Sequence, residues 1–282
     1  MHGGTQGNGR SGMDARNLER RPEGAFTSLI FPTYNPGRIL ERTWRELVPF
    51  LRRAPGEWEV LFVCDGCTDG TPAWLAQLAR AEGERIRILS YAPNRGKGYA
   101  VRRGLEAARG EWRLFTDVDL AYGFEDVLRV AQALQAGAAV AIASRAHPES
   151  QMVLPTRLQG YAYRRHLQSL AFSALVRCLL PLKQRDTQAG LKGLSAAAAQ
   201  TLLPRLSCDG FGFDCELLTA CRHYGLTVEE VPVCVRYEDR ASTTGTGAMK
   251  QMVKELWHIR RCWRRMAPPE PVLATGPDRQ AA

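Results

Sequence analysis

The sequence predicts an α/β fold with a mainly parallel, Rossmann-like sheet flanked by helices. Short apolar runs alternate with amphipathic segments from Phe26 to Arg145. The apolar runs are nearly continuous, as in parallel strands that are covered on both faces. With 282 residues, of which 45% are hydrophobic, the chain is also long enough to bury a large core.

In the first half of the chain, each strand and helix of this fold can be predicted in order. SLIFPTYN is an apolar run that ends in turn residues, RILERTWRELVPFLRR has helical periodicity, and WEVLFVCDG is a second buried run. The same alternation predicts the helices TPAWLAQLARAEG, KGYAVRRGLEAARG and FEDVLRVAQALQAG and the strands IRILSYAPN, WRLFTDVDL and AAVAIASR. Repeated units of this kind favour parallel strands, whose ligands bind beyond the carboxyl ends.

The second half is less regular. One or two helices are predicted over 156–182, and the polar loop KQRDTQAGLKGLS then enters a strand. AAAAQTLLPRL and GFDCELLTACRHYG have the pattern of helices, LTVEEVPVCVRYED that of a strand, and GAMKQMVKELWHIRRCWRRM that of a basic amphipathic helix. We therefore predict a disordered tail over 1–24, a folded domain over 25–247, an amphipathic helix over 248–266 and a disordered tail over 267–282.

Charge and cysteine usage limit the classes of function. The net charge of +9 indicates an anionic partner, such as nucleic acid, an acidic membrane surface or a phosphorylated small molecule. The 8 cysteines have no repeating spacing and no signal peptide precedes them, so we expect reduced cytosolic thiols. The most apolar stretch, 170–182, contains Arg177 and is shorter than a bilayer span, so we expect no transmembrane helix.

Polar residues follow each predicted strand of the first half. In LFTDVDL, Asp117 and Asp119 come at the end of an apolar run. Two carboxylates at this spacing can converge on one hard divalent cation and leave positions for phosphate oxygens. An Asp-x-Asp sequence also occurs in solvated loops, but its place on the ligand side of a parallel sheet favours a metal site.

The stretch VCDGCTDGT follows a strand in the same way. Here Thr71 can cap the next helix, with Pro72 at its first position, and Asp65 is then free to accept hydrogen bonds from a ligand. A zinc site would need a second cysteine pair, and a thioredoxin-like site would place a cysteine at the start of a helix. We therefore interpret Cys64 and Cys67 as structural thiols.

A Gly-Lys-Gly in PNRGKGYAVRRG lies at a strand-to-helix junction. The Lys97 ammonium and the helix amides could meet a phosphate there. The spacing is not that of a Walker loop, so an ordinary glycine turn before a basic helix is the alternative.

Together, the segments FPTYN, VCDGCTDGT, NRGKGYAVRRG, FTDVDL and ASRAH resemble the family 2 inverting glycosyltransferases with the nucleotide-diphospho-sugar transferase (GT-A) fold. QRDTQAGLKGLS and GFGFDCELL are similar to the dolichyl-phosphate glucosyltransferases and their prokaryotic polyprenyl-phosphate relatives. The resemblance covers residues 26–245 and implies that 25–247 is a catalytic domain. The implied reaction is transfer of a hexose, glucose from UDP-glucose, to a polyprenyl or dolichyl phosphate with inversion.

The resemblance also implies the roles of individual residues. A Mg²⁺ or Mn²⁺ ion held by Asp119, with Asp117 nearer the ribose or a metal-bound water, would stabilise the departing diphosphate. Asp186 and Gln188 would face the transferred sugar or the acceptor, and whether Asp186 is a base or a sugar ligand stays open. The nucleotide pocket would be lined by Pro32, Tyr34, Asn35 and Asp65, with Lys97 next to it.

Two departures from the family pattern concern the first loop. Cys64 and Cys67 occupy the positions of an acid and a serine in the family, which explains the cysteine pair as two substitutions around Asp65. Pro36 occupies a position where many relatives have Glu, so the nucleotide base stays open.

A lipid phosphate acceptor would require positively charged side chains rather than a catalytic base. Such a phosphate is ionised at neutral pH, so no strong base is required, but two anions must be held together. The candidates for binding the acceptor phosphate are Arg145, Arg164, Arg165, Arg185, Arg240 and Ser242. For some of these residues, the alternative is that they belong to a solvated basic surface.

The helix over 248–266 mixes Met, Trp and Leu with Lys and Arg, a composition suited to an anionic headgroup layer. The alternative is a helix packed on the domain with a solvated basic face. We expect peripheral association with the cytoplasmic face of a membrane, without a transmembrane helix.

Other functions compete with this one. The same fold could use GDP-mannose or another nucleotide sugar as donor, or a non-polyprenyl acceptor. A non-catalytic protein that binds anionic lipid or nucleic acid would explain the charge. It would not explain apolar strands that end in Asp65, Asp117 and Asp119, which repel phosphate unless a cation intervenes. We therefore expect no nucleic-acid partner.

Overall fold

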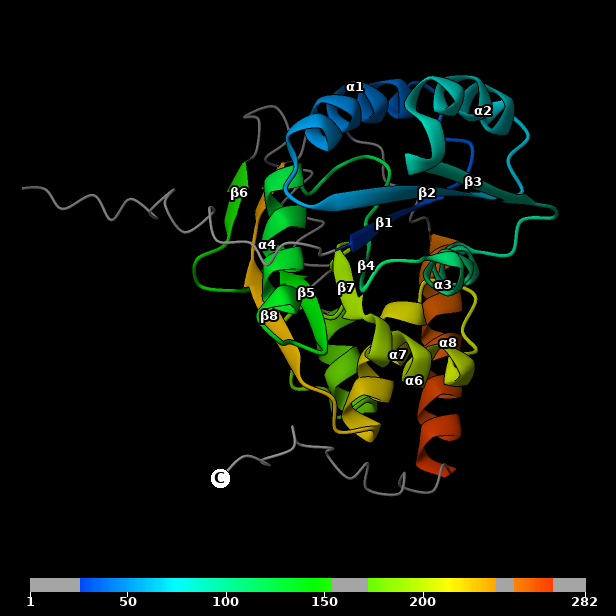
Figure 1. The fold of residues 1–282 in the computed structure, drawn as a ribbon. Coiled ribbons are helices and arrows are strands. Elements are labelled where there is room, and N and C mark those ends of the chain that lie inside the picture. Colours follow the sequence, from blue (N-terminus) through cyan, green and yellow to red (C-terminus); the bar gives the residue numbers. More distant parts are fainter. Residues whose placement is uncertain (1–25, 154–171, 237–245, 266–282) are drawn as a thin grey trace, which may run out of the picture.

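A seven-stranded, mostly parallel sheet organises the protein (Figure 1). The computed structural model describes residues 26–153, 172–236 and 246–265. The strand order is β3-β2-β1-β4-β7-β5-β8, and β7 alone is antiparallel to its neighbours. The strands are β1 (Phe26–Thr33), β2 (Glu57–Asp65), β3 (Ile86–Tyr91), β4 (Trp112–Phe115), β5 (Val140–Ser144), β7 (Lys192–Ser195) and β8 (Val228–Pro232). The predicted α/β fold with a mainly parallel sheet is confirmed.

Helices cover both faces of the sheet (Figure 1). One face carries α1 (Arg38–Arg53), α2 (Thr71–Glu82) and α4 (Phe124–Gln135). The other carries α3 (Lys97–Ala107), α6 (Ala196–Leu202), α7 (Phe213–His223) and α8 (Thr246–Arg265), together with a helix over 172–179. Short 3-10 turns, η2 (Gly83–Arg85) and η4 (Leu203–Arg205), follow α2 and α6. Each helix predicted from periodicity has a counterpart in the structure; of the segment 156–182, the structure describes only the part from 172, which contains the helix over 172–179.

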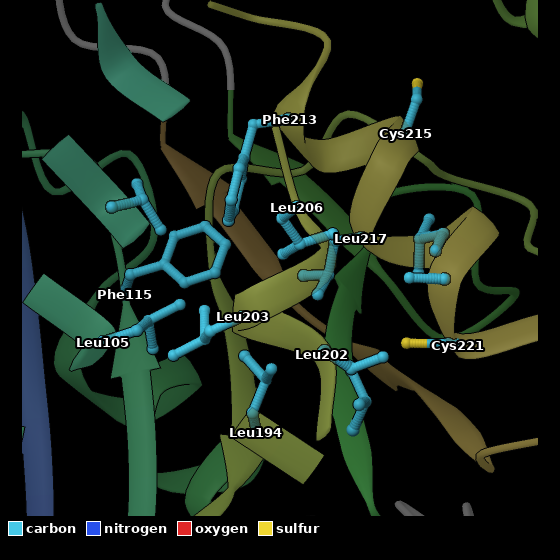
Figure 2. Packing of buried hydrophobic residues seen from close by; sticks show 14 of the residues in the cluster. Leu105, Phe115, Leu194, Leu202, Leu203, Leu206, Phe213, Cys215, Leu217 and Cys221 are labelled. Carbon is cyan, nitrogen blue, oxygen red and sulfur yellow. The ribbon is translucent and has the colours of Figure 1, made fainter. Parts of the chain in front are cut away.

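The central strands are buried because both of their faces meet helices. Along β1, Leu29 and Phe31 join the core under α1 and α2, whereas Ile30, between them, joins the core under α3, α6 and α7. This alternation follows the two-residue period of a strand. Figure 2 shows the second of these cores, where Phe115 of β4 lies between Leu105 of α3 and the residues of α6 and α7.

The strand predicted for LTVEEVPVCVRYED is divided between two sheets. β8 ends at Pro232, and β9 (Cys234–Arg236) pairs instead with β6 (Gln151–Val153) in a separate two-stranded sheet. Proline has no N–H for a strand ladder, and the N–H of Cys234 donates to the carboxylate of Asp126 at 3.2 Å. The chain therefore leaves the main sheet at this point.

The apolar face of α8 is packed on the domain. Met252, Leu256, Ile259 and Trp263 are buried in the core shared with α7 and the helix over 172–179. These side chains are therefore unavailable to a membrane, and Trp257, at 58% exposure, is the large apolar side chain that α8 presents to solvent in its described part. This packing matches the alternative expected for 248–266, a helix docked on the domain with a basic outer face. No helix in the described part of the chain has the length and apolar character needed to cross a membrane.

Candidate active site

Residues from four strands meet at one edge of the main sheet. β2, β1, β4 and β5 run in the same direction, so their carboxyl ends lie at the same edge. β7 runs in the opposite direction, and the loop that precedes it therefore reaches this edge too. The polar residues at this edge are Asp65, the last residue of β2, Asn35 after β1, Asp117 and Asp119 after β4, and Arg145 after β5.

Asp117 and Asp119 lie in a turn directly after β4, and α1 fixes this turn. The Thr43 hydroxyl donates to the Val118 carbonyl, and the Arg42 guanidinium donates to the Asp119 carbonyl at 2.5 Å. Burial raises the pKa of Asp119 above its ordinary value, and the negative charge of Asp117 acts in the same direction. A cation beside this acidic turn would relieve both effects.

The Lys97 ammonium lies against the acidic turn. Its Nζ is 2.5 Å from Oδ1 of Asp117, and its side chain is 21% exposed. Burial alone would lower the pKa of Lys97, but the charges of Asp117 and Asp214 raise it above its ordinary value. Lys97 is also the first residue of α3, so the positive end of this helix lies at the same place. A lysine that stays protonated thus accompanies the two carboxylates.

A buried ion pair lies behind the acidic turn. Lys192 of β7 is fully buried, and its Nζ is 2.7 Å from Oδ1 of Asp214 in the first turn of α7. The same Nζ donates to the Ala189 carbonyl at 2.5 Å. The next residue, Gly190, is so close to Asp117 that a Cβ at position 190 would overlap with its carboxylate. The ion pair therefore fixes the backbone that borders Asp117, a role that the sequence did not suggest.

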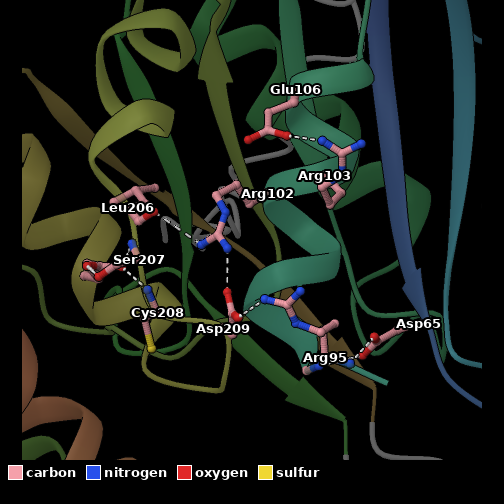
Figure 3. A network of polar contacts seen from close by, with 11 residues as sticks. Asp65, Arg95, Arg102, Arg103, Glu106, Leu206, Ser207, Cys208 and Asp209 are labelled. Carbon is pink, nitrogen blue, oxygen red and sulfur yellow. Dashed lines mark hydrogen bonds and ion pairs between the residues drawn. The ribbon is translucent and has the colours of Figure 1, made fainter. Parts of the chain in front are cut away.

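Asp65 holds the loop between β3 and α3. Its carboxylate accepts hydrogen bonds from the backbone N–H groups of Arg95 (2.6 Å) and Gly96 (2.8 Å) and from Nδ2 of Asn94 (2.9 Å). Figure 3 shows Asp65 next to Arg95. The prediction that Asp65 is free to accept hydrogen bonds from a ligand was therefore wrong, because donors from its own chain already engage both carboxylate oxygens.

Asp209 joins the same loop to the segment before α7 (Figure 3). Its carboxylate binds Arg95 at 3.0 Å and Arg102 at 2.5 Å. Gly96 and Gly98 permit this close approach, since a Cβ at either position would overlap with carbonyl oxygens of the facing segment. The glycines of the NRGKG motif thus serve backbone packing that positions Lys97.

Asp69 lies just before α2 and binds the N–H of its first residue. Its carboxylate accepts hydrogen bonds from the N–H of Thr71 at 3.1 Å and the N–H of Gly37 at 3.4 Å. Burial alone would raise the pKa of Asp69, but the Thr71 side chain and these two N–H groups lower it below its ordinary value through hydrogen bonds. The predicted cap was wrong: α2 begins at Thr71, whose hydroxyl does not cap it, and Pro72 is its second residue. Because Thr71 is itself helical, its N–H needs a partner, and Asp69 supplies one.

Cys64 and Cys67 are free thiols. Burial raises the pKa of Cys64 to about 12 and also raises the pKa of Cys67, whose Sγ donates to the Thr33 carbonyl at 3.3 Å. The thiolate is the reactive and metal-binding form of cysteine. This geometry therefore supports the interpretation of the pair as structural thiols.

Both thiols are expected to resist alkylation in the folded protein. At about pH 8, iodoacetamide should modify the exposed Cys178 well before Cys64 or Cys67, because their raised pKa values leave almost no thiolate. Peptide mass spectrometry after timed quenching measures the three rates in one sample. Labelling of Cys64 or Cys67 as fast as that of Cys178 would contradict the structural role.

Arg145 and Asp186 form a bidentate ion pair. Nε of Arg145 is 2.6 Å from Oδ2 of Asp186 and Nη2 is 2.9 Å from Oδ1, while the Arg145 N–H donates to Oδ2 at 3.0 Å. The N–H of Gln188 donates to Oδ1 at 3.1 Å. Burial alone would raise the pKa of Asp186, but Arg145 lowers it below its ordinary value. Asp186 is thus ionised and fully hydrogen-bonded, and it holds the Arg145 guanidinium in place.

The other predicted site residues have varied surroundings. Tyr34 is 56% exposed, Pro32 is half-buried in β1, and Asn35 exchanges hydrogen bonds of 2.8 and 3.2 Å with Thr68 across the neighbouring loop. The Gln188 amide lies 3.3 Å from the Cys215 thiol.

The acceptor-side candidates are only partly visible. Arg185 is exposed, and its N–H donates to the carboxylate of Glu230 at 2.9 Å. Arg164, Arg165, Arg240 and Ser242 lie outside the described residues.

A metal ion would need ligands beyond those of the protein. Within 26–153, 172–236 and 246–265, no group of three or more His, Cys, Asp or Glu side chains could hold a metal ion. Asp117 and Asp119 supply two carboxylates, whereas Mg²⁺ and Mn²⁺ favour about six oxygen ligands. Phosphate oxygens and water would complete such a shell. The raised pKa of Asp119, caused by burial and by Asp117, fits a divalent cation at this position.

Comparison with solved structures identifies the class of fold. Glucosyl-3-phosphoglycerate synthase from Mycobacterium tuberculosis, crystallised with Mg²⁺ and uridine diphosphate, superposes with a TM-score of 0.62 at 20% identity and covers 89% of this chain and 85% of its own. Mannosyl-3-phosphoglycerate synthase from Rubrobacter xylanophilus gives a TM-score of 0.62 at 18% identity, covering 88% of this chain and 78% of its own. The fold is thus that of the GT-A glycosyltransferases.

Comparison of sequences identifies the family. Residues 28–199 match the model of Glycosyl transferase family 2. Dolichyl-phosphate beta-glucosyltransferase of Saccharomyces cerevisiae is 31% identical over 88% of this chain and 78% of its own length, and the enzyme of that name from Homo sapiens is 30% identical over 83% and 74%. The chain belongs to glycosyl transferase family 2 and is a nucleotide-sugar glycosyltransferase.

Proposed function

We propose that this protein transfers glucose from UDP-glucose to a polyprenyl phosphate of the dolichyl phosphate type, with inversion at the anomeric carbon. The observation that carries the proposal is the acidic turn of Asp117 and Asp119, with Lys97 2.5 Å from Asp117, at the carboxyl edge of a GT-A sheet. The choice of these substrates is supported by the similarity of this chain, over most of both chains, to enzymes named dolichyl-phosphate beta-glucosyltransferase.

On the donor side, the leaving diphosphate gains negative charge as the anomeric bond breaks. Asp119 and Asp117 would hold a Mg²⁺ or Mn²⁺ ion, which when bound supplies Lewis-acid stabilisation of that charge. The Lys97 ammonium and the start of α3 would add positive charge at the same place. Pro32, Tyr34, Asn35 and Asp65 would border the nucleotide, with the exposed Tyr34 ring free to contact the base and Asp65 fixing the loop that carries Lys97.

On the acceptor side, the phosphate oxygen is already a nucleophile. A phosphate monoester carries one to two negative charges at neutral pH, so the reaction does not require a strong base. Asp186, ionised and bound to Arg145 through two hydrogen bonds, is better suited to orient Arg145 than to remove a proton. We assign Arg145 to the acceptor phosphate and Asp186 as its positioning residue. Gln188 and Arg185 lie on the same loop and would border the sugar or the acceptor.

A polyprenyl acceptor also requires contact with a membrane. Trp257 is 58% exposed on α8, beside the exposed Arg261 and Arg264. Exposed Trp and Arg side chains favour the interfacial layer of anionic membranes. We propose peripheral association at the cytoplasmic face through this side of α8, with its opposite side docked on the domain.

A donor and acceptor panel tests the function. Purified protein is incubated with Mg²⁺, a short polyprenyl phosphate and, in separate reactions, UDP-glucose, GDP-mannose and other nucleotide sugars, and the glycolipids are identified by mass. We expect a glucosyl phospholipid from UDP-glucose. If product forms from another donor, or only with a soluble sugar or a different lipid as acceptor, the protein is still a glycosyltransferase, but the proposed substrate is wrong. The absence of any product would contradict the proposal.

Substitution of Asp186 tests its positioning role. Asp186→Asn keeps the shape but removes the charge that holds Arg145, so we expect kcat to fall about tenfold or more, with a raised KM for the acceptor and little change in KM for UDP-glucose. Asp186→Glu should recover part of the loss. If the only effect were a raised KM for UDP-glucose, the assignment of Asp186 to the acceptor side would be contradicted.

The ion pair of Asp186 with Arg145 is also expected to make the stability of the fold depend on pH. The pKa of Asp186 is lower in the folded protein than its ordinary value, so the ion pair stabilises the fold at neutral pH and this contribution is lost as the pH falls through the folded pKa. The difference in free energy of unfolding between wild type and Asp186→Asn should therefore shrink on acidification. Urea unfolding at a series of pH values measures it, and a difference that grows toward acid pH would contradict the ion-pair argument.

A further inference from the structure

A basic pocket lies at the edge of the sheet opposite the candidate active site. It has a volume of about 370 Å³ and is formed by the helix over 172–179, the end of α7 and the end of α8. α7 starts near Gly98 at the active-site edge and ends at His223. Shortly after it, the Thr227 carbonyl accepts a hydrogen bond from the N–H of Val140, the first residue of β5, at the opposite edge. With 11 residues, α7 separates the two places by about 16 Å.

The lining of this pocket is strongly cationic. Arg177, Arg222, Arg260 and Arg264 contribute to it from three helices, and no described lining residue is acidic. The Trp263 and His223 rings form part of its wall and lie 5.4 Å apart, centroid to centroid. A pocket of this kind combines flat apolar surface with several guanidinium groups.

Two of the four arginines have a structural role. Arg260 donates to the carbonyls of Cys178 at 3.3 Å and Leu179 at 3.1 Å, and Arg222 donates to the Pro181 carbonyl. The carbonyls of Cys178 and Leu179 lie at the end of the helix over 172–179, where backbone acceptors lack helical partners, and Pro181 lies just beyond this end. Both side chains are thereby held in position with N–H groups to spare, since a guanidinium has five.

The other two arginines have no such role. Arg177 and Arg264 are exposed, and the structure gives neither of them a carboxylate or carbonyl partner among the residues it describes. Clustered guanidinium groups repel one another, and their charges cannot be removed at physiological pH because the arginine pKa lies above 12. An anion in the pocket would relieve this repulsion.

We propose that this pocket is a second anion site, which binds a phosphate-bearing molecule between Arg177 and Arg264 with Arg222 and Arg260 as fixed flanking donors. Arginine binds phosphate oxygens in a two-pronged manner, and several converging guanidinium groups distinguish a phosphate from a carboxylate or a halide. The volume of about 370 Å³ exceeds that of a single phosphate and leaves room for an attached group against Trp263. The phosphate could come from a soluble diphosphate or from a lipid headgroup, which share this chemistry.

A charge-matched pair of double variants tests the site. The pocket variant is Arg177→Gln with Arg264→Gln, and the control is Arg53→Gln with Arg80→Gln, which removes the same charge from exposed positions in the last turns of α1 and α2 that do not line the pocket. Inorganic pyrophosphate is titrated calorimetrically in metal-free buffer, where the acidic turn repels it. We expect wild type and control to bind, and the pocket variant to bind at least about tenfold more weakly.

Vesicles distinguish the two sources of phosphate. Sedimentation with phosphatidylcholine vesicles, with and without phosphatidic acid, is compared for the same three proteins. Loss of pyrophosphate binding in the pocket variant alone supports a soluble ligand, and loss of phosphatidic acid-dependent sedimentation in that variant alone supports a lipid headgroup. Equal behaviour of pocket and control variants with both probes would overturn the proposal. Thermal unfolding verifies that all three proteins are folded, and failure of this site would leave the proposed sugar transfer untouched.

Discussion

Asp119→Asn is expected to abolish sugar transfer while the protein stays folded. The substitution keeps the side-chain size and the carbonyl oxygen that accepts from Ala121, but removes a carboxylate charge from the acidic turn. Because that charge would hold the cation that stabilises the leaving diphosphate, we expect kcat to fall by about 10³-fold or more. Initial rates with UDP-glucose, Mg²⁺ and a short polyprenyl phosphate measure the effect.

The stability of this variant should change in the opposite direction. Burial and the nearby charge of Asp117 raise the pKa of Asp119, so the ionised carboxylate is destabilised in the folded protein. Removing it should leave the melting temperature unchanged or slightly higher. A large decrease would mean that the lost activity comes from unfolding.

Glu106→Gln is the matched control for Asp119→Asn. Glu106 lies on α3 and pairs with Arg103 at 2.8 Å on the surface, so the substitution changes the same charge without touching the acidic turn. We expect full activity from it. Manganese titration in the presence of UDP, followed by electron paramagnetic resonance, should show bound metal for wild type and Glu106→Gln and none for Asp119→Asn. Activity of Asp119→Asn within tenfold of wild type would exclude the metal role.

The sequence was sufficient for the fold because the pattern that defines it is local. Alternation of apolar runs and amphipathic segments located β1 to β5 and the helices between them, and the resemblance in order and spacing of the motifs pointed to the family. The parallel topology brings the polar residues after each strand to one edge, so the sequence alone is sufficient to place Asp117 and Asp119 there.

What the sequence did not predict depends on partners that are distant in the chain. Asp65 is followed by glycine and looks available, yet both of its carboxylate oxygens accept hydrogen bonds from the loop 94–96, about thirty residues later. The apolar face of α8 is equally suited to lipid or protein, and only the position of α7 decides that it is buried. Local composition contains no information on either choice.

The ion pair of Lys192 and Asp214 was missed for the same reason. Both residues lie in motifs that carry the resemblance, QRDTQAGLKGLS and GFGFDCELL, but a lysine in a four-residue strand is ordinarily expected at the surface. Lys192 is buried because it bridges from β7 to the first turn of α7, 22 residues away, and its ammonium also meets the Ala189 carbonyl. The available signal was a lysine in a short strand that directly follows the polar loop of a site motif.

Lys192→Met is accordingly expected to have the largest effect on stability. Methionine fills a similar volume, but Asp214 would remain buried, at 5% exposure, without its cation. Removing one partner of a buried ion pair costs about 3–5 kcal/mol. We expect the free energy of unfolding to fall by about this amount, measured by urea unfolding at neutral pH, with a matching fall in the melting temperature.

Two further variants separate the charge effect from packing. Asp214→Asn leaves Lys192 with the Ala189 carbonyl and should be destabilising as well. The double variant Lys192→Met with Asp214→Leu removes both charges, and we expect it to be more stable than either single variant, because no buried charge is then left unpaired. Additive losses in the double variant would show that the two residues act independently.

The double variant also shows what the ion pair contributes to the active site. It should restore folding without restoring activity, because the Ala189 carbonyl loses its donor and the neighbouring Gly190, which is packed against Asp117, is no longer fixed. The charge of Asp214 also helps to raise the pKa of Lys97, so its loss removes part of the electrostatic stabilisation of the Lys97 ammonium beside the acidic turn. A double variant with wild-type kcat would confine the ion pair to stability, whereas a folded protein with a reduced kcat would establish that it positions Asp117 and Lys97.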